Sequence, residues 1–370
     1  MTDAPMTAPA STATAGEVLS RYLTEQAGRF LRALPQAVGE AGARPGAVPS
    51  VNAPGGTAGT GELLRTVRRI GGAVHTFGAL FEPGWAEEFR AELRWLLTLL
   101  AQEPAYARRS ARLLAALDTL SATGSAGETG GPGMLAGHQG APKARALLDR
   151  QLTLARTRAH STVLQELRSA RLHALADRMT LLVGEAPLLA AAAGTAGEVL
   201  LPQAARAVDA LSVAVQALPL RRAATAYQGD ALHRLAATGA QVPAQGRAAA
   251  PGAPESADNA LAADDAPWHR VRVLLKRARY AGEVSGRTDP ELDELDLVLD
   301  RHQEAADAAV TAATAARTPR ITPATAYVLG VVHADQRLEV EAARYAFGSR
   351  WPSLSLAPDG WEGPPAPRTA

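Results

Sequence analysis

A run of basic side chains lies between His269 and Tyr280, a stretch that holds no acidic residue. At about 100° per residue, side chains three and four positions apart share one side of a helix. Like charges at these spacings repel each other, so a stripe of one sign favours an anionic partner. Arginine forks match phosphate oxygens in bidentate geometry. We therefore predict a phosphate-contacting helical stripe made of His269, Arg272, Lys276 and Arg279, with Arg277 beside it.

A weaker set of basic residues lies in the first half of the chain. Arg65, Arg68 and His75 fall on one side of a predicted helix, and Arg69 adjoins them. The adjacent glycines at 71–72 would let a chain approach the backbone closely. We interpret them instead as positions that have lost their side chains. For both helices the residues alone leave a second interpretation open, a charged outer face that binds nothing.

Other chemistries find little support in the residues. There is no cysteine, no phosphate-binding loop and no nucleophile elbow. The histidines outside the basic helices lack paired metal-ligand spacing, so no metal site and no cofactor is predicted. A phosphohydrolase would need clustered carboxylates to hold metal. Asp264 and Asp265 fall in a predicted linker, and the acidic run 289–300 is typical of a solvated helix face.

The elements that must position these residues are predicted to be helices. Aromatic residues make up only 4% of the chain, and apolar residues recur at helical spacing with no long alternating run. Each half contains an Arg-rich helix after a linker, which favours a duplicated bundle. The predicted fold class is all-α, with two pseudo-repeated antiparallel four-helix bundles.

Segments rich in Gly, Pro, Ala, Ser and Thr divide the helical patterns. We predict tails at 1–14 and 356–370 and one helical domain over 15–355, with an N-terminal bundle at about 15–185 and a C-terminal bundle at about 186–355. Predicted linkers cover 1–14, 39–61, 122–141 and 239–267. Neither a signal peptide nor a membrane span is expected, and the protein is expected to be cytoplasmic.

The second basic helix resembles a motif of the CHAD family, the conserved-histidine α-helical domain. The family pattern H-x-x-R-x-x-x-K-R-x-R-Y-x-x-E is matched in full by His269, Arg272, Lys276, Arg277, Arg279, Tyr280 and Glu283. The next helix is similar to the family's L-G-x-H-x-D turn over residues 299–304, with Asp300 in place of Gly and Glu304 in place of Asp. Residues 347–351 resemble its F-x-x-x-W ending.

The family's first motif, H-x-x-R-V-x-x-R-R-x-R, is only partly present. Arg68 and Arg69 match it, and Arg65 and His75 are neighbours of the matching positions. The resemblance covers roughly residues 15–354. It implies that a flexible polyanion binds in a basic groove between two four-helix bundles.

The resemblance and the basic stripes together predict non-catalytic binding of inorganic polyphosphate. The expected contacts are His269, Arg272, Lys276, Arg279, Arg277, Arg68, Arg69, Arg65 and His75. Nucleic acid is not expected, because aromatic residues for base stacking are not interleaved with the stripe, Tyr280 excepted. Net charge is only +1, so it does not decide the partner. The alternative is a helical scaffold or protein-interaction module that has lost part of the polyphosphate site. The sequence leaves the oligomeric state open.

Overall fold

The protein is described by a computed structural model over residues 13–42, 58–122, 134–223 and 253–353. In these ranges every regular element is a helix, which confirms the all-α prediction. The α-helices are α1 (Ala15–Gly42), α2 (Ala58–Thr76), α3 (Pro83–Ser121), α4 (Ala141–Glu166), α5 (Ala170–Gly184), α6 (Ala196–Gln216), α7 (Leu220–Ala223), α9 (Ala253–Val284), α10 (Pro290–Ala316) and α11 (Pro323–Arg350). None of them is long and apolar enough to cross a membrane.

Local sequence signals fix where two of the long helices begin. Asp289 accepts hydrogen bonds from the backbone N–H groups of Glu291 and Leu292 at 3.0 and 3.2 Å, and a proline follows it as the first residue of α10. Thr322 caps α11 in the same way, with Pro323 as its first residue. A proline tolerates this position because its missing N–H would have no partner inside the helix.

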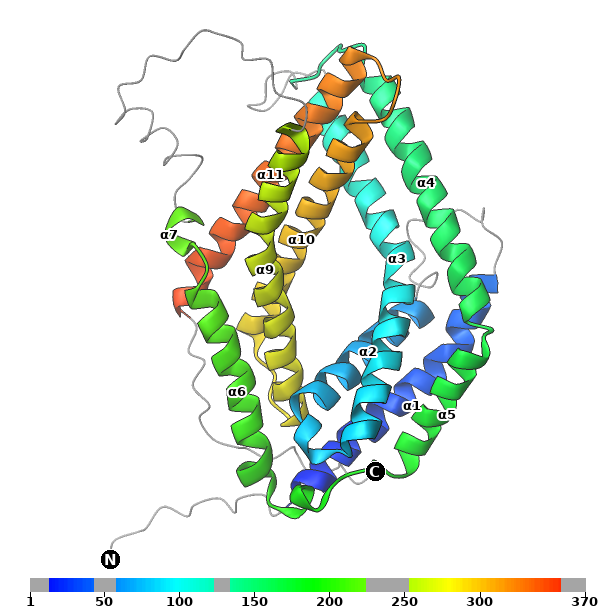
Figure 1. Cartoon of the computed structure of the whole chain (residues 1–370), viewed down its shortest axis with the longest axis vertical. Coiled ribbons are helices and arrows are strands. Elements are labelled where there is room, and N and C mark those ends of the chain that lie inside the picture. Colours follow the sequence, from blue (N-terminus) through cyan, green and yellow to red (C-terminus); the bar gives the residue numbers. More distant parts are fainter. Residues whose placement is uncertain (1–12, 43–57, 123–133, 224–252, 354–370) are drawn as a thin grey trace, which may run out of the picture.

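The long helices outline a four-sided frame (Figure 1). One side is formed by α3 and α4, which run together, and the facing side by α9, α10 and α11. At the lower end of this view α2 contacts α9, and at the upper end α10 and α11 contact α3 and α4. The frame thereby places α2, α3, α9 and α10 around a shared interior.

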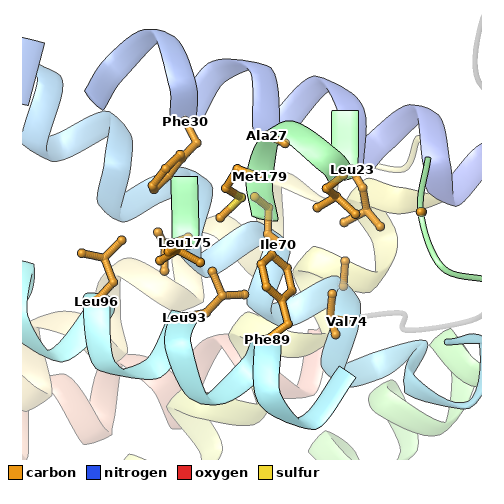
Figure 2. Packing of buried hydrophobic residues seen from close by; sticks show 14 of the residues in the cluster. Leu23, Ala27, Phe30, Ile70, Val74, Phe89, Leu93, Leu96, Leu175 and Met179 are labelled. Atoms are coloured by element: carbon orange, nitrogen blue, oxygen red, sulfur yellow. The ribbon is translucent and has the colours of Figure 1, made fainter. Parts of the chain in front are cut away.

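The largest hydrophobic cluster joins α1, α2, the first part of α3, and α5 (Figure 2). Side chains from all four helices point toward one another, among them Phe30, Ile70, Phe89 and Met179, each with none of its surface exposed. Burying a side chain of this size contributes about 1.5–3 kcal/mol. This cluster fixes the position of α2, which carries part of the predicted site, against α3.

Two further clusters hold the other half of the frame. One joins the end of α6 to α9, the first half of α10 and the end of α11. The other contains Leu113 of α3 and Leu148 of α4 together with Ala312 of α10 and Val328 of α11. Helices from both predicted bundles therefore share this last core. The division into two bundles near residue 185, and their duplication, stay predictions.

Three of the predicted linkers are partly wrong. Residues 39–42 belong to α1 and 58–61 to α2, and α9 begins at Ala253, well inside the predicted linker 239–267. In the linker 122–141, Leu135 is buried, and a Cβ on Gly140 would lie 2.3 Å from the carbonyl oxygen of Ala324. The remaining parts of these linkers, residues 1–12 and the tail from 356 lie outside the described residues.

Tertiary ion pairs explain why the linker assignment failed at α9. Arg337 of α11 donates to both carboxylate oxygens of Asp265 at 2.7 and 3.1 Å, and Arg344 donates to Asp264 at 2.6 Å. A polar, Ala-rich stretch is thus held in a helix by partners more than 70 residues away, a contact that local composition does not reveal.

Candidate functional site

A cleft of about 860 Å³ lies between α2, α3, α9 and α10. Six of the nine predicted site residues line it: Arg68 and His75 from α2, and His269, Arg272, Lys276 and Arg277 from α9. These residues line the cleft together because they recur at helical spacing, so that one side of α2 and one side of α9 face the same space.

The other three predicted site residues do not line the cleft. Arg65 is exposed and pairs with Glu62 one turn earlier in α2, at 2.6 Å. Arg69 pairs with Glu283 of α9 at 2.7 Å, and Tyr22 of α1 donates to the same carboxylate at 3.2 Å. These contacts tie α1, α2 and α9 together, so Arg69 serves packing.

Arg279 is the third residue placed elsewhere. Its guanidinium pairs with Asp293 at 2.5 Å and with Asp296, both on α10. It lines a much smaller cavity between α6, α9 and α10 and is not part of the cleft lining. The predicted stripe of one sign is thus divided between two surfaces.

Three arginines of α3 that the sequence prediction missed also line the cleft: Arg90, Arg94 and Arg108. The signal that was available is the four-residue spacing of Arg90 and Arg94, which places two like charges on one side of a helix. Arg90 and Arg94 both approach Glu87, at 3.3 and 3.6 Å, and that carboxylate is largely exposed.

The prediction of a solvated face for the acidic run 289–300 is wrong at Asp296 and Asp300, whereas Glu291, Asp293 and Glu294 are exposed. Asp300 accepts a hydrogen bond from Arg272 Nε at 2.5 Å and one from Lys276 Nζ at 3.2 Å. Asp296, whose side chain is only 10% exposed, pairs with Lys276 and Arg279. Carboxylates of α10 therefore neutralise the basic stripe of α9 within the protein.

The ionisation of Asp300 follows from these contacts. Burial opposes the charged form, but the charges and hydrogen bonds of Arg272 and Lys276 outweigh it, so that the pKa of Asp300 lies below its ordinary value. Asp300 is therefore a carboxylate at neutral pH. We call this side of the cleft the paired wall: Arg272, Lys276, Asp300, Glu304, Asp307 and Arg108.

A second group of lining residues, which we call the basic wall, consists of Arg68, His75, Arg90, Arg94 and Arg277. Within the described part of the chain, Arg68 and Arg277 make no ion pair. Burial and the positive charge of Arg90 lower the pKa of Arg277. Like charges are therefore crowded here without a carboxylate directly paired to Arg277.

His75 lies in the same positive electrostatic field of the neighbouring arginines. Burial, followed by the charges of Arg277, Arg90 and Arg94, lowers its pKa to about 4. The imidazole is therefore neutral at physiological pH while the cleft holds no anion. An anion placed among these groups would favour the protonated form.

The glycine interpretation was wrong at Gly72. This residue is buried against Tyr280, and a Cβ at position 72 would lie 2.6 Å from Tyr280 Cδ2. The missing side chain thus permits the close contact of α2 with α9 at the edge of the cleft. At Gly71 the nearest atom to such a Cβ is 3.8 Å away, so the same reason does not apply there.

In the part of the chain that the structure describes, no three His, Asp or Glu side chains gather closely enough to hold a metal ion. The chemistry that the cleft lining offers is hydrogen-bond donation from guanidinium, ammonium and imidazole groups.

Known proteins resemble this chain in sequence and fold. The model of the CHAD domain family matches residues 60–316. The structure of PptA from Streptomyces chartreusis is 42% identical, with a TM-score of 0.69, and the match covers 92% of this chain and all of that one. A CHAD domain from the plant Ricinus communis shares the fold at 17% identity, with a TM-score of 0.54, over 94% and 95% of the two chains. No curated protein matches. The chain belongs to the CHAD domain family.

Proposed function

We propose that this protein binds inorganic polyphosphate, or a similar flexible polyanion, in the cleft between α2, α3, α9 and α10, and that it does so without catalysis. Membership of the CHAD family supports the class of ligand. The ligand contacts would be made mainly by the basic wall, with His269 at one end of the lining.

The observation that carries this proposal is the crowding of cations on the basic wall. Arg277 is about half-buried, and Arg90 lies close enough to lower its pKa. Holding like charges together in a partly desolvated cleft is unfavourable, and a phosphate chain would offset that repulsion. The cleft is also large enough, at about 860 Å³, for several phosphate groups.

The experiment that tests this function is a calorimetric titration with long-chain polyphosphate, single-stranded DNA and heparin at two salt concentrations. Electrostatic binding to phosphates should weaken steeply as salt is added. The slope of log K against log salt should be about −0.7 to −0.9 for each phosphate contacted. Polyphosphate should bind most tightly, since the cleft offers phosphate contacts without a row of aromatic side chains for bases. Absence of salt-sensitive binding would contradict the proposal.

Binding should also take up protons at His75. Bound phosphates offset the neighbouring arginine charges, so the pKa of His75 should rise from about 4 toward the ordinary 6.5. The free protein binds fewer protons than the complex in the window between these values, so affinity should increase as pH falls from 6.5 toward 4. Titrations at pH 5.5 in buffers of different ionisation enthalpy measure this uptake, and His75→Gln should reduce it.

The scaffold alternative remains the second candidate, and one observation favours it. Arg272, Lys276 and Arg279, the centre of the complete family motif, are all engaged by carboxylates of α10. The scaffold function would be supported if the wild-type protein shows no salt-sensitive polyanion binding and forms a stable complex with a protein partner.

A further inference from the structure

We propose that Asp300 is an internal competitor for the anion: its carboxylate occupies Arg272 and Lys276, so that a phosphate chain in the cleft binds along the basic wall. The inference rests on the proposed function and specifies which side of the cleft binds the anion and what sets its affinity. It makes Asp300 a residue that tunes affinity rather than one that contacts the ligand.

The geometry of Asp300 is that of a bound anion. One carboxylate oxygen accepts from Arg272 Nε at 2.5 Å, and the other accepts from Lys276 Nζ at 3.2 Å. A phosphate group would use the same two donors in the same way. While Asp300 pairs with Arg272 and Lys276, its negative charge offsets part of their positive charge, so they attract a phosphate less strongly.

Asp300 differs from its neighbour Asp296 in where it lies. The side chain of Asp300 is 36% exposed and lines the cleft, whereas that of Asp296 is 10% exposed and lies behind Lys276 and Arg279. Asp296 thus holds α9 to α10 from within, and Lys276 keeps this partner if Asp300 is removed. Asp300 occupies the cleft surface that an incoming phosphate would need.

Displacing Asp300 would cost more than breaking two ion pairs. Glu304 and Asp307 also line the cleft from α10. They pair with Arg108 at 2.9 Å and with Arg109 at 3.0 Å, respectively. A phosphate entering this wall would face a row of carboxylates, whereas Arg68 and Arg277 of the basic wall present no such competition.

The test is Asp300→Asn, which preserves size and removes the charge. Polyphosphate should bind roughly tenfold more tightly at low salt, and the slope of log K against log salt should steepen by about 1.4, as for two added phosphate contacts. Adding Arg272→Gln to Asp300→Asn should cancel much of the gain, which a double-mutant cycle measures. Asp118→Asn is the matched control, because it removes the same charge. Asp118 pairs with Arg145 at the surface of α3 and α4, outside the cleft lining.

A second comparison needs no change at Asp300. Arg272→Gln alone should alter polyphosphate affinity by less than about threefold, whereas Arg277→Gln should weaken it roughly tenfold. Equal losses from these two variants would overturn the inference, as would Asp300→Asn binding no better than Asp118→Asn. If the wild type binds with a steep salt dependence, either result contradicts this inference alone. Absence of wild-type binding contradicts the proposed function as well.

Discussion

Reversing the charge of two arginines, with Arg68→Glu and Arg277→Glu combined, should weaken polyphosphate binding by at least about 100-fold at low salt. Each guanidinium lost removes a charged hydrogen bond of about 1.5–3 kcal/mol, and each glutamate adds repulsion toward phosphate. The slope of log K against log salt should become shallower by about 1.4–1.8, because two phosphate contacts disappear. Calorimetry at several salt concentrations gives both quantities.

The fold should survive this double change. Neither Arg68 nor Arg277 holds an ion pair within the described residues, and a glutamate near Arg90 would relieve the positive crowding that lowers the pKa of Arg277. Thermal unfolding monitored by circular dichroism checks this.

The matched control reverses two other arginines, with Arg150→Glu and Arg158→Glu combined. Both residues are exposed on α4 and outside the lining of the cleft. The control changes net charge by the same amount and should weaken binding only slightly. Equal losses from the two double variants would mean that diffuse positive charge attracts the polyanion and that the cleft is not the site.

The helices themselves could be predicted because their signals are local. Apolar spacing, scarce aromatic residues and a proline at a helix start all act within a few residues of the chain. Pro323, for example, is the first residue of α11. The same local reading placed Arg68, His75 and four residues of α9 on surfaces that do meet at one cleft.

What could not be predicted depends on contacts between distant segments. Arg272 and Asp300 are 28 residues apart, and nothing in either helix alone indicates that the basic side of one faces the acidic side of the other. The sequence therefore predicts solvated carboxylates at Asp296 and Asp300, where the structure has ion pairs. The interpretation of Gly72 was wrong for the same reason, because the residue that it packs against, Tyr280, lies about 200 positions later in the chain. Arg90 lies outside both basic helices, and only its four-residue spacing from Arg94 indicates a basic side of α3.

The largest expected effect on stability comes from Arg344→Met. The side chain of Arg344 is 10% exposed, and it donates to Asp264 at 2.6 Å, to Asp265 at 2.6 Å and to His302 Nε2 at 3.1 Å. Its guanidinium also lies 5.3 Å from the centre of the Trp268 ring. These contacts join α9, α10 and α11.

Removing Arg344 leaves two carboxylates, Asp265 at 17% and Asp264 at 33% side-chain exposure, with one cation fewer. Asp265 keeps Arg337, but Asp264 loses its ion pair. Burial, the largest cause of the low pKa of His302, remains after the change and disfavours a compensating positive charge there. Breaking a buried pair by deleting one partner costs about 3–5 kcal/mol. This is a large fraction of the roughly 5–15 kcal/mol that stabilises an ordinary protein.

The control for this prediction is Arg29→Met, which deletes an arginine of similar size from the exposed pair with Glu25, where the two side chains are 41% and 54% exposed. An exposed pair contributes at most about 1 kcal/mol, so this variant should unfold at nearly the wild-type urea concentration. Arg344→Met should lower the free energy of unfolding by about 3 kcal/mol or more relative to it. If the two variants are equally stable, water or Arg337 must satisfy the carboxylates, and the network joining α9, α10 and α11 contributes little. A large loss would mean that ion pairs between residues 72 to 80 positions apart hold α9 in the position where its basic residues face the cleft.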